Sequence, residues 1–182
     1  MKAAAICIIL VIVVLVLAGP AAILVSLLTY VPPEPAVYEG SILDFYEENT
    51  DLLNAAAEIL WAHPEFFDQR RIKGEYDSMC RAEEVLGNAL NHSMFTDSQW
   101  QTIRRVFERT EVFWIEYYYG GPPELTFRLR TTQDELASLH YICTEGYTPS
   151  QVAMELRYYK QFYARFEQLA DPRWYAAYPE ED

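Results

Sequence analysis

The fold is decided by residues 112–130, which read VFWIEYYYGGPPELTFRLR. The first part, 112–119, is rich in aromatic and β-branched residues, and 125–130 alternates strictly between apolar and polar side chains. Both patterns are typical of β-strands, and the Gly-Gly-Pro-Pro sequence at 120–123 predicts a turn between them. We therefore expect an antiparallel pair with one face on a core and the other face open to water.

Further strands are expected after this pair. Residues 136–143 have the composition of a third strand, whereas 152–169 are ambiguous because their apolar residues fit either a helix or a strand. We favour a hairpin that turns at Asp171-Pro172 and returns along 174–178. A short helical turn over 149–154 is expected to precede this hairpin.

Helices are expected before residue 112. Ser41 with Asp44 is typical of a helix N-cap, and apolar residues then recur with helical spacing to Ala62. A second helix is predicted over 77–90, and Thr96 with Gln99 forms a capping box at the start of a third. Helices first and strands afterwards predict an α+β fold, with about three helices on an antiparallel meander of about five strands.

The run at 3–31 contains no charged side chain and is long enough to cross a bilayer. A cleaved signal peptide is the alternative, but cleavage near Pro20 would leave an apolar new terminus. We expect a transmembrane anchor at 1–31, a proline-rich spacer at 32–40 and a single extracytoplasmic domain at 41–182. Lys2 is the only basic residue before Arg70, which favours a cytoplasmic N-terminus and an outward-facing domain in the cell membrane.

The domain is strongly acidic. All 27 acidic residues and all but one of the 14 basic residues follow the apolar run, which gives the chain after residue 31 a net charge of −14. Nucleic acid is excluded as a partner, since phosphate binding requires a basic surface. The acidity fits either solubility or a cationic partner. Cys80 and Cys143 are the one pair that could form a disulfide outside the cell, although two free thiols fit the sequence equally well.

The candidate ligand-binding face follows from strand alternation. Arg128 and Arg130 share one face of their strand, and if the registers agree Trp114, Tyr118 and His140 join them. Arginines bind carboxylates through two hydrogen bonds, and flat aromatic rings stack on sugars or peptides. The alternative is that the arginines pair with Glu116 and Glu124 on a solvated face while Trp114 lies in the core.

Motifs for catalysis or cofactor binding are absent from the sequence. It contains no Gly-x-Ser-x-Gly, no His-Glu-x-x-His and no Cys-x-x-Cys. We therefore expect a protein that is not an enzyme and that has no metal or cofactor.

The chain consists of an apolar run, an acidic domain and a closing Trp174-Tyr175-x-x-Tyr178 segment, in that order. This plan resembles that of small uncharacterised single-pass envelope proteins of anaerobic Gram-positive bacteria. The resemblance implies no activity. We expect an interaction or structural module of the cell envelope, with a membrane contact through the N-terminal helix and an envelope or protein partner. An anchored hydrolase with a dispersed site and an acidic immunity-type or inhibitor protein are the alternatives.

Overall fold

The computed structural model describes residues 36–70, 79–87, 90, 92–119, 122–134 and 137–179. The predicted anchor at 1–31 and the first part of the spacer lie outside these ranges. Within them, no helix combines the length and the apolar composition that a membrane span requires. The chain divides into Met1–Glu34 and Pro35–Asp182, and the following description concerns the second unit.

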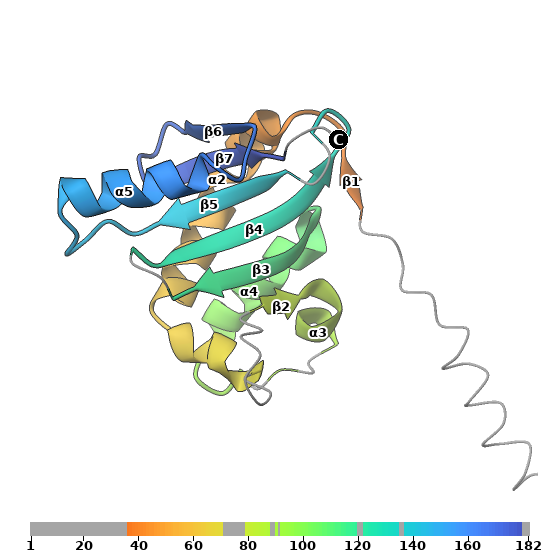
Figure 1. Cartoon of the computed structure of the whole chain (residues 1–182). Coiled ribbons are helices and arrows are strands. Elements are labelled where there is room, and N and C mark those ends of the chain that lie inside the picture. The colour runs from red at the N-terminus through yellow and green to blue at the C-terminus, as the bar shows by residue number, and fades with distance from the viewer. Residues whose placement is uncertain are drawn as a thin grey trace, which may run out of the picture. The chain divides into compact units, whose positions relative to one another are not determined.

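The described residues form a seven-stranded sheet (Figure 1). The strands are β1 (Val37–Tyr38), β2 (Met79–Arg81), β3 (Val112–Tyr118), β4 (Glu124–Thr131), β5 (Ser138–Ile142), β6 (Arg165–Gln168) and β7 (Trp174–Tyr178). Six strands follow the order β2-β3-β4-β5-β7-β6 and are antiparallel, while β1 pairs in parallel with the end of β4.

The helices are α2 (Ile42–Trp61), α3 (Ala82–Leu86), α4 (Asp97–Arg109) and α5 (Pro149–Tyr159), with a 3-10 helix η1 (Pro64–Arg70). Figure 1 shows α2 and α4 behind the sheet and α5 at the side of the domain, next to β5. The predicted α+β class with an antiparallel sheet is confirmed.

Capping boxes fix the start of the three longest helices. Ser41 and Thr96 close the predicted boxes of α2 and α4, and each side-chain oxygen accepts a hydrogen bond from the third helical residue. Thr148 does the same for α5, with Pro149 as the first helical residue. Because the first turn of a helix has N–H groups without helical partners, each box stabilises the helix locally and sets where it begins.

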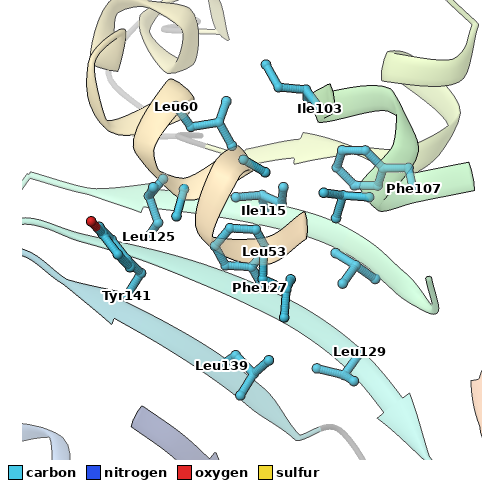
Figure 2. Packing of buried hydrophobic residues seen from close by; sticks show 14 of the residues in the cluster. Leu53, Leu60, Ile103, Phe107, Ile115, Leu125, Phe127, Leu129, Leu139 and Tyr141 are labelled. Atoms are coloured by element: carbon cyan, nitrogen blue, oxygen red, sulfur yellow. The ribbon is translucent and has the colours of Figure 1, made fainter. Parts of the chain in front are cut away.

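The core lies between one face of the sheet and helices α2 and α4. Figure 2 shows Leu53 and Leu60 of α2 and Ile103 and Phe107 of α4 packed over the strands. The strand residues that meet them alternate along the chain, as period two requires, and are buried: Ile115, Leu125, Phe127, Leu129, Leu139 and Tyr141.

Trp174 joins α2 to the last strand. Its ring is completely buried and lies 5.3 Å from Phe127 and 5.2 Å from Tyr141, measured between ring centroids. Its indole N–H donates a 2.6 Å hydrogen bond to the side-chain oxygen of Asn54. The one polar group of this side chain is thus satisfied within the core, as burial of an indole requires.

Three sequence predictions are corrected. The helix predicted over 77–90 is confirmed at α3 but wrong at 79–81, which form β2 because Cys80 enters the core as β2 pairs with β3, and residues 77, 78, 88 and 89 lie outside the described ranges. Val37 and Tyr38, assigned to the spacer, form β1 on the end of β4. The helical turn predicted at 149–154 continues to Tyr159.

The hairpin over β6 and β7 is confirmed, but its position changes the topology. The sheet is not a simple meander, because β7 inserts between β5 and β6.

Candidate functional site: an arginine–tryptophan sheet face

The strand pairings place the five predicted residues on one side of the sheet. Trp114 stands opposite Arg128, Tyr118 opposite Glu124, and Thr126 opposite His140. Residues that face each other in an antiparallel pair project to the same side, and alternation adds Arg130. A bulge between Val112 and Trp114 keeps Val112 on the core side. The shared face is therefore as predicted, and it is the face opposite the main core.

The half of this face over β3 and β4 carries unused hydrogen-bond donors. The Nε atoms of Arg128 and Arg130 and the indole Nε1 of Trp114 are buried and have no hydrogen-bond partner. The three side chains are partly exposed, so a ligand can reach their outer atoms, whereas the three buried N–H groups become accessible to it only when these side chains move. Because a buried donor without an acceptor costs free energy, this half of the face is suited to bind a group that supplies acceptors.

The alternative, in which the arginines pair with neighbouring glutamates, is not what the structure has. Among the described residues, neither Arg128 nor Arg130 forms an ion pair with a carboxylate. Glu124 pairs instead with His140. Trp114 lies on the open side rather than in the core, with its ring 4.7 Å from that of Phe113.

The geometry of the strand sets the spacing of the two guanidinium groups. Arg128 and Arg130 are two residues apart on β4, and a strand rises about 3.3 Å per residue, so their attachment points are about 7 Å apart. Arg81 of β2 stands opposite Trp114 and extends the same row. The face therefore presents a row of cationic and aromatic side chains, with the acidic Glu116 on the same side of β3.

His140 is a correction to the predicted face. Its side chain is on the expected side but only 1% exposed. The rings of Tyr159, Tyr163 and Phe166 lie 5.7, 5.4 and 5.4 Å from the imidazole. Residues of α5, β6 and the loop between them thus cover this half of the sheet, and His140 is unavailable to a ligand.

Under this cover lies a buried polar network. His140 Nδ1 is 3.2 Å from Glu124 Oε1, and His140 Nε2 is 2.9 Å from Ser138 Oγ. The Thr126 hydroxyl donates to the same Glu124 oxygen at 3.0 Å. Because Glu124 is only 4% exposed, its charge depends on these partners.

The electrostatics of the network follow from this geometry. Burial acts to raise the pKa of Glu124, but the charge and hydrogen bond of His140 and the hydroxyls of Tyr159 and Thr126 outweigh it, so the pKa is lowered. The pKa of the Tyr159 hydroxyl is raised, first by burial and then by the nearby Glu124 carboxylate. Glu124 is therefore held as the carboxylate beside a neutral phenol.

Ser138, His140 and Glu124 have the connectivity of a nucleophile, a general base and an orienting acid. Sequence reasoning missed this set, although a Ser-x-His step on one strand opposite an acid on its neighbour is the signal that could have found it. Ser138 is completely buried, however. In this conformation no substrate reaches its hydroxyl, and the network acts as a structural link between the sheet and α5.

A separate depression of about 720 Å³ lies between α2 and the turn before β7, and it is lined by Tyr46, Glu47, Thr50 and residues 170–173. Its cation, Arg173, is already bound by Asp171 at 2.8 Å and by the Tyr141 hydroxyl at 3.0 Å. The depression therefore has no free charged donor to offer a ligand.

The described residues contain no group of three or more His, Cys, Asp or Glu that could hold a metal ion. No disulfide joins Cys80 and Cys143 in the structure. Comparisons with protein-family models, curated proteins and solved structures find no match to this chain. The function therefore has to be argued from the residues themselves.

Proposed function

We propose that this protein is a membrane-anchored binding module of the cell envelope whose β3–β4 face binds a carboxylate-bearing ligand. One observation carries the proposal: three N–H donors, from Trp114, Arg128 and Arg130, lie on one sheet face without partners. The proposal includes the anchor at 1–31, a cytoplasmic N-terminus and an outward-facing domain, and it assigns no catalytic activity.

The charge distribution supports an anionic ligand. Because the chain after residue 31 has a net charge of −14, most of the domain surface repels carboxylates. The row of Arg81, Arg128 and Arg130 offers a local attraction that differs from its surroundings. Such contrast favours a defined binding position, since an anion is attracted to one place and repelled elsewhere.

The chemistry of the side chains specifies the ligand further. A guanidinium group binds a carboxylate through two parallel hydrogen bonds, and the Trp114 ring provides a flat apolar surface beside it. Two arginines about 7 Å apart match carboxylates on alternate residues of an extended chain, because that is the repeat of one strand face. We therefore assign an extended acidic polymer as the ligand class.

The test uses the full chain in nanodiscs and poly-glutamate as the probe, with binding measured by calorimetry. We expect the double variant Arg128→Gln/Arg130→Gln to lose affinity at least about tenfold, since a hydrogen bond to a charged group contributes about 1.5–3 kcal/mol. Arg105→Gln is the matched control, because Arg105 is an exposed residue of α4 and this helix packs on the other side of the sheet. Equal affinities in all three proteins, or no binding by the parent, would rule the proposal out.

The anchored hydrolase is the second candidate, and the Ser138–His140–Glu124 geometry is what favours it. Because Ser138 is completely buried, we expect a fluorophosphonate probe to leave it unmodified. Intact-mass analysis of parent and Ser138→Ala protein decides the matter. A mass increase in the parent that the variant lacks would favour the hydrolase over the binding module as the function of the protein.

The orientation of the domain has its own test. A cysteine introduced in place of Ala36, in a Cys7→Ser/Cys143→Ser background, is treated with a membrane-impermeant maleimide in intact cells. We expect labelling without lysis. Labelling only after lysis would place the domain in the cytoplasm.

A further inference from the structure

Helix α5 exposes a stripe of large apolar side chains. Met154 is 65% exposed, Tyr158 49% and Phe162, just beyond the helix, 57%. The rings of Tyr158 and Phe162 are in contact, with centroids 4.7 Å apart. Residues four apart lie on the same side of a helix, so these side chains form one continuous strip.

The attachment of α5 to the domain leaves this strip free. Tyr159 is the one buried residue of the helix, and Leu156 packs beside it in the small cluster with Ile142 and Tyr175. Figure 1 shows α5 at the side of the domain next to β5. The inward side of α5 is thus occupied by the sheet, while the strip faces outward.

The charges on the outward side of α5 are positive. Arg157 and Lys160 are exposed, whereas Glu155, the acid of this helix, is half-buried on the inward side. Glu155 lies near Glu124, and the pKa of its carboxyl is raised, first by burial and then by that second carboxylate. The nearest acids along the chain, Glu145 and Glu167, fall outside the helix. The outward side of α5 therefore combines apolar side chains with two cations.

We infer that the outward side of α5 lies in the headgroup region of an anionic bilayer. Helices that lie in a membrane interface place aromatic and long apolar side chains toward the acyl chains and basic residues toward the headgroups. The stems of Arg157 and Lys160 can follow the apolar strip while their charges reach lipid phosphates. A bilayer is the occupant because its surface supplies both the apolar layer and the negative charge that this helix complements.

This inference rests on the anchor in the proposed function. An anchor at 1–31 would keep the chain at a membrane. The acidity of the rest of the domain does not prevent contact, since at 0.1 M salt charges farther away than about 10 Å are largely screened.

The experiment places a nitroxide at position 158 of the full chain in nanodiscs. Tyr158→Cys is made in a Cys7→Ser/Cys143→Ser background, and Cys80 is kept because it is buried. Accessibility to oxygen and to a water-soluble nickel chelate reports the depth of the label. Glu108→Cys, exposed on α4, is the control, and a second label at Phe162 tests whether substitution at 158 disturbs the helix.

With phosphatidylglycerol in the disc, we expect oxygen to reach the labels at 158 and 162 better than the nickel chelate does, and the reverse at 108. Each basic residue near an anionic surface strengthens association about fivefold, so Arg157→Gln/Lys160→Gln should lower the ratio of immersed to free label about 25-fold. Labels at 158 and 162 as open to the chelate as that at 108 would overturn the inference.

The two proposals fail separately. Poly-glutamate binding is measured in the same nanodiscs. If poly-glutamate still binds while the labels on α5 are exposed to water, only the bilayer contact is ruled out. Release of the chain from the discs at alkaline pH would remove the anchor, and the inference about α5 with it.

Discussion

The buried pair of Glu124 and His140 makes the sharpest stability prediction. In the His140→Phe variant the Glu124 carboxylate, 4% exposed, loses its partner at 3.2 Å and keeps the Thr126 hydroxyl as a donor. Removing a hydrogen-bond partner of a buried charged group costs about 1–3 kcal/mol or more, because the Glu124 charge stays buried with less compensation. A domain of ordinary stability has about 5–15 kcal/mol in total, so we expect a loss that urea unfolding resolves clearly at 25 °C.

The assay is urea unfolding at pH 7, followed by tryptophan fluorescence. Glu124→Leu/His140→Phe is the matched control, since replacing both partners with apolar groups removes the stranded charge and should restore the free energy of unfolding to within about 1 kcal/mol of the parent. A loss below about 1 kcal/mol in His140→Phe would refute the reasoning. So would a double variant as unstable as the single one.

Three further predictions concern stability. Folding lowers the pKa of Glu124, so the contribution of its carboxylate to the free energy of unfolding is complete above the ordinary glutamate pKa of about 4.3 and is lost as the pH falls below it. The urea midpoint should therefore drop more steeply in acid for the parent than for Glu124→Gln. Trp174→Phe removes the 2.6 Å hydrogen bond to Asn54 and leaves a cavity, which should cost about 2 kcal/mol in the same urea assay. Thr96→Ala removes the N-cap of α4 and should lower the free energy of unfolding by about 1 kcal/mol, whereas Thr144→Ala, at an exposed position outside any helix, should not.

The parts of the fold that local sequence specifies were predictable. Helices α2 and α4 begin at capping boxes, and strands β3 and β4 show period two because one face of each is buried. The parts that depend on distant partners were not. Residues 79–81 form β2 only because β3 offers an edge to pair with, and the two-residue β1 exists only through its pairing with β4.

The candidate site divides in the same way. Alternation along single strands was enough to place Arg128, Arg130 and Trp114 on one face, because a strand has only two faces. The burial of His140 was not visible, since the side chains that cover it come from α5 and β6, whose packing depends on the tertiary fold. For the same reason the link from His140 to Ser138 and Glu124 appeared only in the structure.

The central claim is that an acidic polymer binds the donors on the β3–β4 face. The most direct measurement is an NMR titration with poly-glutamate that follows the indole N–H of Trp114 and the Nε–H groups of Arg128 and Arg130. We expect these three signals to shift together and saturate, while the indole signal of the buried Trp100 stays in place. Saturable binding that leaves the three signals unmoved, or no binding at all, would contradict it.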